Sequence, residues 1–173
     1  STLFPYTTLF RSGDILVSRS FDITATDTAL TLNTKAYEAA IASFPSLMDQ
    51  IEGDLIPVAQ DLSQRCYHAL TDRPEGLGLL DFTQPAATLE RLVRALDLGA
   101  YWNPLCVPKI QGDELYRVGS ARLTESHAAP GTLIELGEDH LTVACGEHAL
   151  VLTGLTRLCG AAVAPKDVAQ VGQ

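Results

Sequence analysis

The chain has few cysteines and no cysteine pair of the kind that holds a metal ion. Its 173 residues include 4 cysteines, which lie far apart at Cys66, Cys106, Cys145 and Cys159. A CxxC pair is typical of a zinc site, and closely spaced cysteines are typical of small disulfide-stabilised secreted domains. Because neither pattern occurs, the sequence favours buried free thiols in a reducing cytoplasm.

Basic residues are also scarce. The chain carries 12 lysines and arginines against 21 aspartates and glutamates, a formal net charge of −9, and its acidic residues are spread along the sequence. Since affinity for nucleic acids comes largely from neutralising phosphates with lysine and arginine, this balance argues against a nucleic acid held by this chain alone. A small molecule or another protein is the expected partner.

Signals for crossing a membrane or for secretion are lacking as well. No uncharged apolar run approaches the ~20 residues that a spanning helix needs, and the N-terminus lacks the basic and apolar segments of a signal peptide. With 46% apolar and 19% charged residues, the composition is that of a globular protein. We therefore expect a folded cytoplasmic protein without a membrane partner.

Common catalytic and nucleotide-binding motifs do not occur: GxSxG, GxGxxG, GxxxxGK and HExxH are all absent. His140, Cys145 and His148 lie close together in the sequence, but they number three and both histidines fall in predicted turns. A structural zinc site needs four ligands. We therefore expect no metal site, and we expect His68 and His127 to be surface residues.

The first twelve residues, STLFPYTTLFRS, have a pattern unlike that of the remaining chain. They resemble the translated remnant of a sequencing adapter, so residues 1–12 are treated as non-native and left out of the fold prediction. On this interpretation the natural sequence resumes near Gly13, partway through a domain.

The N-terminal half predicts one long helix after an extended segment. Apolar and polar residues alternate between Asp14 and Ile23, which predicts one or two strands. Thr26 or Asp27 can cap the helix that follows, and Gly53 suits its end. Pro45 is predicted to kink or restart this helix, and its apolar face is predicted to dock on a sheet. The apolar positions are Leu30, Tyr37, Ile41, Phe44, Met48 and Ile51.

A second helix is predicted after a long connection over residues 54–85, in which prolines and glycines are scattered. Pro85 fits its first turn, and Gly99 follows its end. Thr83 or Gln84 is predicted to cap the free amides at its start. Its apolar side carries Leu89, Leu92, Val93 and Leu96.

The remaining sequence changes to strand periodicity with turn-like breaks, an arrangement typical of a small antiparallel barrel. The tail after Gly160 predicts the start of a linker. The predicted strands are Leu105–Ile110, Glu114–Leu123, Thr132–Leu136, Leu141–Cys145 and Ala149–Leu158.

Five segments occur in an order that is characteristic of one family. They are GDIL at residues 13–16, ITATDTALTLNTKAYEAA at 23–40, a connector containing Gln60, RALD at 94–97 and PGTLIEL at 130–136. With these segments the chain from Gly13 to about Leu158 resembles the formyltransferase family, which includes methionyl-tRNA formyltransferase and the formylation domains of nonribosomal peptide synthetases.

The resemblance implies an α+β fold, in which the truncated end of an α/β formyltransferase domain precedes a small antiparallel, OB-like β-barrel. Residues 13–60 would end the catalytic domain and residues 61–103 would form a connector and a helix. Residues 104–160 would form the barrel, and residues 161–173 a linker or tail.

The segment ALDLGAYWNPLCVPKI resembles the synthetase-associated or stand-alone biosynthetic branch of the family more than the tRNA branch. From Pro104 to the end, 5 basic residues face 8 acidic ones, a net charge of −3, whereas a barrel that holds tRNA is expected to be basic. The likeness is carried by Asn103, Pro104, Leu105, Pro108 and Lys109.

The resemblance also implies a reaction, the transfer of a formyl group from 10-formyltetrahydrofolate to an amine. The family uses an Asn and a His from an upstream NxHxSLLP-like motif that this chain lacks, and an Asp from a DxGDIL-like motif whose position Arg11 holds here. No catalytic residue is therefore expected in this chain, and the chain alone is expected to be inactive. Gly13 and Asp14 are expected to line the folate pocket.

The resemblance leaves the accepting amine open. A carrier-protein-bound aminoacyl thioester in nonribosomal peptide or related biosynthesis is the first hypothesis. Methionyl-tRNA, a sugar nucleotide and a hydroxylamine are alternatives, and a further alternative is a non-catalytic docking module of a synthetase.

Overall fold

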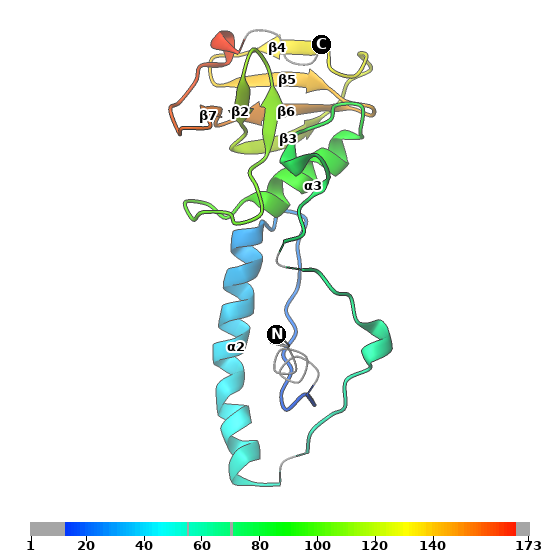
Figure 1. The fold of residues 1–173 in the computed structure, drawn as a ribbon, viewed down its shortest axis with the longest axis vertical. Helices are drawn as coiled ribbons and strands as arrows, with labels where there is room; N and C mark the ends of the chain where they lie inside the picture. The colour runs from blue at the N-terminus through cyan, green and yellow to red at the C-terminus, as the bar shows by residue number, and fades with distance from the viewer. Residues whose placement is uncertain (1–12, 55, 70, 169–173) are drawn as a thin grey trace, which may run out of the picture. The chain divides into compact units, whose positions relative to one another are not determined.

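A computed structural model of the chain describes residues 13–54, 56–69 and 71–168 (Figure 1). The chain divides into two compact units. In the described part of the chain, the first holds residues 13–24, 31–54 and 56–69, and the second holds residues 25–30 and 71–168. Among the described residues, no helix is both long enough and apolar enough to cross a membrane.

The first unit is dominated by helix α2, Ala29–Glu52, which confirms the long helix predicted from the sequence. The helix is continuous through Pro45, so the predicted restart is wrong. Proline removes a single backbone bond, and the remaining turns of a 24-residue helix keep theirs. The helix ends with the amide of Gly53 donating to the carbonyl of Asp49 over 3.1 Å.

The strands predicted between Asp14 and Ile23 do not form. The described segment makes a single bridge, in which Ile15 and Val58 exchange backbone hydrogen bonds of 2.8 and 2.9 Å. A strand persists only where a neighbour pairs its amides and carbonyls, and the described part of this unit offers one pair. The α/β sheet implied by the resemblance is therefore not represented in residues 13–69.

The apolar face of α2 is exposed. No residue of the helix is buried, and the side chains of Tyr37 and Ile41 keep 68% and 69% of their surface accessible. Phe44 and Ile51 are exposed as well. The amphipathic pattern is present as predicted, but the described residues include no sheet on which it docks.

The second unit consists of one α-helix and short antiparallel strands. Helix α3, Ala86–Leu96, is confirmed, with Leu89, Val93 and Leu96 buried. Two antiparallel sheets are formed among the described residues, in the orders β1-β2-β7 and β3-β6-β5-β4. The strands are β1 Lys109–Gln111, β2 Leu115–Arg117, β3 Ser120–Thr124, β4 Leu133–Leu136, β5 His140–Ala144, β6 Ala149–Thr153 and β7 Thr156–Arg157.

Two of the five predicted strands are each divided between the two sheets. Glu114–Leu123 becomes β2 and β3, and Ala149–Leu158 becomes β6 and β7. Both breaks fall at glycines that meet: a side chain on Gly119 would lie 3.1 Å from the Cα of Gly154, which itself has a φ of 65°. The close approach of the two backbones lets the chain change sheets there.

The core of the second unit lies between the sheets and α3, which packs on β3 and β6 (Figure 1). Alternate residues of the central strands point into it, so one face of β3-β6-β5-β4 faces the core and the other faces outward. Val168 is buried at 3% exposure, so the described part of residues 161–173 also packs on this core. The largest fully buried side chains are Tyr116, Ile110, Leu141, Leu150, Leu152, Val93, Val118 and Val143.

The predicted cap of α3 is wrong. No side chain caps the helix; instead the amide of Ala86 donates to the backbone carbonyl of Glu147 over 3.0 Å. Asp81 forms a local turn, accepting from the hydroxyl and amide of Thr83 over 2.7 and 3.0 Å. These bonds lower the pKa of the Asp81 carboxyl. A distant hairpin therefore supplies the acceptor expected from a neighbouring side chain.

Candidate functional site

Gly13 and Asp14, which are expected to line a folate pocket, lie in a segment of the first unit that is hydrogen-bonded to residues 58–60. The side chain of Gln60 donates its Nε2 hydrogen to the carbonyl of Gly13, next to the Ile15–Val58 bridge. Asp14 is exposed in this segment. Arg11 lies outside the described residues. The sequence identified Gln60 only as a landmark in the connector, and the fold brings it to Gly13.

The three candidate metal ligands do not form a ligand set. His140 lies on the outer face of the four-stranded sheet, whereas the Cys145 thiol is buried and directed to the carbonyl of Val143 at 3.7 Å. Burial raises the pKa of the Cys145 thiol to about 11, which makes it a poor ligand. Across residues 13–54, 56–69 and 71–168, no three His, Cys, Asp or Glu side chains gather as a metal site.

The predicted surface positions of His68 and His127 are confirmed, because both side chains are exposed. His68 additionally lies against Cys66, with 3.3 Å between Nε2 and Sγ.

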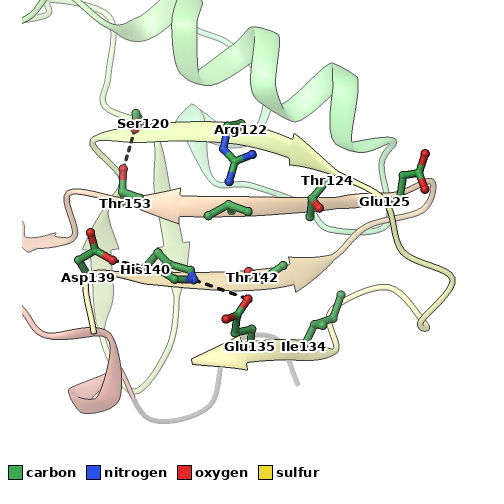
Figure 2. Close-up of a pocket in the computed structure, with 11 residues that line it drawn as sticks. Ser120, Arg122, Thr124, Glu125, Ile134, Glu135, Asp139, His140, Thr142 and Thr153 are labelled. Carbon is green, nitrogen blue, oxygen red and sulfur yellow. Dashed lines mark hydrogen bonds and ion pairs between the residues drawn. The ribbon is translucent and has the colours of Figure 1, made fainter. Parts of the chain in front are cut away.

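A cavity of about 540 Å³ lies on the outer face of β3-β6-β5-β4 (Figure 2). The strand register places Arg122, Val151, Thr142 and Glu135 in one row across the sheet. In a neighbouring row Ser120 and Thr153 share a hydrogen bond of 2.7 Å. The first of these rows therefore begins at the guanidinium of Arg122 on one edge of the sheet and ends at the carboxylate of Glu135 on the other.

His140 contacts two carboxylates on this face. Its Nδ1 lies 3.0 Å from Oδ1 of Asp139, and its Nε2 lies 3.6 Å from Oε2 of Glu135. The hydrogen bond with Asp139 and the charge of the more distant Glu135 raise the pKa of His140 above its ordinary value, while the hydrogen bond with His140 lowers the pKa of Asp139. Both carboxylates thus favour the protonated imidazole.

Replacing Asp139 by asparagine is expected to lower the pKa of His140, because the first cause of its rise is removed. Since the folded-state pKa is raised, the pair stabilises the fold below the unfolded-state pKa, and this contribution is lost as the pH rises through the folded-state pKa. An NMR titration of the His140 ring would measure the shift. Glu138→Gln is the matched control, since Glu138 is not among the groups that shift the pKa of His140; an equal shift in both variants would contradict the assignment.

Comparison with known proteins places this chain in a family. The family model described as "Formyl transferase, C-terminal domain" matches residues 75–171. The methionyl-tRNA formyltransferase of Ectopseudomonas mendocina is 36% identical over 158 residues, which are 91% of this chain and 48% of that protein. That of Granulibacter bethesdensis is 37% identical over 142 residues, covering 82% of this chain and 41% of its own.

Solved structures show the same fold at low identity. HypX from Aquifex aeolicus in complex with tetrahydrofolic acid superposes with a TM-score of 0.65 at 17% identity, covering 91% of this chain and 27% of that protein. The N-formyltransferase of Helicobacter canadensis has a TM-score of 0.54 at 12% identity, covering 84% of this chain and 51% of its own. The chain spans about half the length of the curated relatives it matches. With most of its second unit matched by the family model, the chain belongs to the formyltransferase family and carries that family's C-terminal domain.

Proposed function

We propose that this chain is the C-terminal half of a formyltransferase that moves the formyl group of 10-formyltetrahydrofolate to an amine. The observation that carries the proposal is the family match over residues 75–171, together with relatives named formyltransferases that extend to about twice the matched length. The chain itself contributes the domain beside the catalytic centre, and the reacting groups come from the other half.

The division of the chain follows from the same proposal. Residues 13–60 would complete the catalytic α/β domain, and residues 61–103 would connect it to an OB-like β-barrel at 104–160, followed by a tail at 161–173. The exposed apolar face of α2 supports this division, because an amphipathic helix of 24 residues is stabilised mainly by packing on a partner. The other half of the parent protein would supply that partner.

Gly13 and Asp14 are the residues of this chain that we place beside the folate. The side chain of Gln60 donates a hydrogen bond to the carbonyl of Gly13, which fixes the backbone there. The exposed Asp14 presents a carboxylate that can accept hydrogen bonds from a ligand. The folate supplies the activated formyl group, and the donors that stabilise the oxyanion and the base that takes the amine proton would lie upstream.

The relatives' names support methionyl-tRNA as the first acceptor to test. A second candidate, an aminoacyl thioester on a carrier protein, is supported by charge. Residues from Pro104 onward carry 5 basic and 8 acidic side chains, which suits a protein partner better than a polyanion.

A chimera tests the function directly. The N-terminal half of the Ectopseudomonas mendocina enzyme would be joined to residues 13–173, and formyl transfer from 10-formyltetrahydrofolate would be measured with methionyl-tRNA and with an aminoacyl carrier protein. We expect transfer by the chimera and none by the 173-residue chain alone. A folded chimera that transfers to neither acceptor would refute the proposal.

A matched chimera addresses Arg11. One version carries aspartate two residues before Gly13, as the DxGDIL-like motif of the family implies, and the other carries arginine there, as in this chain. Because a positioned acid or base typically contributes about 10² to 10⁴ in rate, we expect the arginine version to be slower by at least about 10². Equal rates would show that the position is not catalytic.

A further inference from the structure

We propose that the outer face of the sheet β3-β6-β5-β4 binds a small zwitterion of the amino-acid or dipeptide class. The ligand's carboxylate would meet Arg122, its ammonium group would meet Glu135, and the hydroxyl of Thr142 would bond between them. This proposal concerns the second unit alone and does not depend on formyl transfer.

The strand register sets opposite charges at the two sides of the cavity. Arg122 pairs with Val151, Val151 with Thr142, and Thr142 with Glu135. Figure 2 shows the side chain of Arg122 pointing from β3 toward β6, and that of Glu135 pointing from β4 toward β5. The two charged groups therefore approach the same space from opposite edges of the sheet.

Arg122 is available to a ligand. It is exposed, and among the described residues no ion pair or hydrogen bond engages its guanidinium. A guanidinium binds a carboxylate through two parallel hydrogen bonds, which gives both affinity and orientation. The arginine thus matches the anionic end of the ligand.

The Thr142 hydroxyl is the observation that points to a ligand rather than to a merely polar surface. Thr142 is 4% exposed, and within the described structure its Oγ1 has no hydrogen-bond partner. Buried polar groups are nearly always paired, because an unpaired one costs about 1–3 kcal/mol. The contact between Glu135 and His140 is long, at 3.6 Å. A ligand that inserts between these two side chains would supply the missing hydrogen-bond partner of the Thr142 hydroxyl.

The size of the face suits one or two amino-acid residues. Neighbouring strands lie about 4.8 Å apart, so the Cα atoms of Arg122 and Glu135 are separated by roughly 14 Å across three spacings. An extended dipeptide spans roughly 7 Å. The side chains of Arg122 and Glu135, which point toward each other, cover the rest of the distance between their Cα atoms. The cavity of about 540 Å³ is within the usual range for a small-molecule site.

The charges select against other ligands. Glu125, Glu135 and Asp139 also line the cavity, opposed by Arg122 and His140. A polyanion would meet these carboxylates along its length, which disfavours a nucleic acid on this face. A ligand with one charge of each sign matches both sides.

The test is an NMR titration of the full chain with glycylglycine and two blocked analogues. Glycylglycine amide lacks the carboxylate, and N-acetylglycylglycine lacks the ammonium group. We expect glycylglycine to shift the amides of Arg122, Thr142 and Glu135 saturably with a Kd of about 1 mM, and each analogue to bind at least about tenfold more weakly. Equal binding of all three compounds, saturable shifts confined to other residues, or no saturation below about 100 mM would each overturn the proposal.

Variants assign the two ends of the ligand separately. Arg122→Gln is expected to bind glycylglycine and its amide equally, and Glu135→Gln to bind glycylglycine and its acetyl form equally. Thr142→Val keeps the shape and removes the unpaired hydroxyl, so we expect affinity to fall about tenfold while thermal stability is kept or raised. Glu138→Gln, outside the cavity, is the control and should bind as the parent does; if the Arg122 and Glu135 variants still discriminate, the proposed orientation is wrong.

Discussion

Gly78→Ala is expected to lower the free energy of unfolding by about 3 kcal/mol or more, from about 1–3 kcal/mol of backbone strain and a similar cost of overpacking. Gly78 has a φ of +83°, which side-chain-bearing residues rarely adopt. A Cβ there would lie 2.5 Å from the carbonyl oxygen of Val107 and 3.2 Å from Cδ1 of the buried Leu96. Urea unfolding monitored by circular dichroism should show the midpoint lowered by roughly 1 M or more.

Gly160→Ala separates strain from crowding. Gly160 has a comparable φ of +93°, but a Cβ there would have no atom within 4 Å. Only the strain remains, so we expect a loss of about 1–2 kcal/mol. Equal losses in the two variants would show that the approach of Val107 to Gly78 does not hold the segment in place.

Helices were predictable from the sequence where their determinants are local. The apolar spacing of Leu89, Val93 and Leu96 predicted both α3 and its buried face. The same kind of pattern predicted α2. An amphipathic face shows only that the helix needs a packing partner, and among the described residues no residue of α2 is buried. The start of α3 was mispredicted because its amide bonds the backbone of Glu147, far along the chain.

The predicted boundaries of two strands were wrong for a related reason, a contact between residues that are distant in the sequence. The predicted strands ran through Gly119 and Gly154 without a break, so the prediction has two long strands where the structure has four short ones. The break depends on the two backbones meeting in space, and nothing in either segment records that contact. Turn residues located the hairpins correctly because turns depend on neighbouring residues.

The polar face of the second unit could not be foreseen from its residues. His140 drew attention as a neighbour of Cys145 and His148, yet its contacts are Asp139 and Glu135. Arg122, Thr142 and Glu135 have no common motif, and only the pairing of four strands puts them in one row. Resemblance identified the family, whereas this face required the register.

Leu152→Ala is expected to cost about 3 kcal/mol, within the range of about 2–5 kcal/mol for deleting a buried leucine side chain. Leu152 is 0% exposed on β6, between β3 and β5, so a cavity there is lined on both sides and cannot collapse easily. Leu136→Ala is the matched control on the edge strand β4, where the side chain is 48% exposed and a loss below about 1 kcal/mol is expected. Urea unfolding of both variants measures the difference. A loss at Leu136 as large as that at Leu152 would mean that β4 is covered in the folded protein, and the open edge beside the Glu135 carboxylate would then not exist.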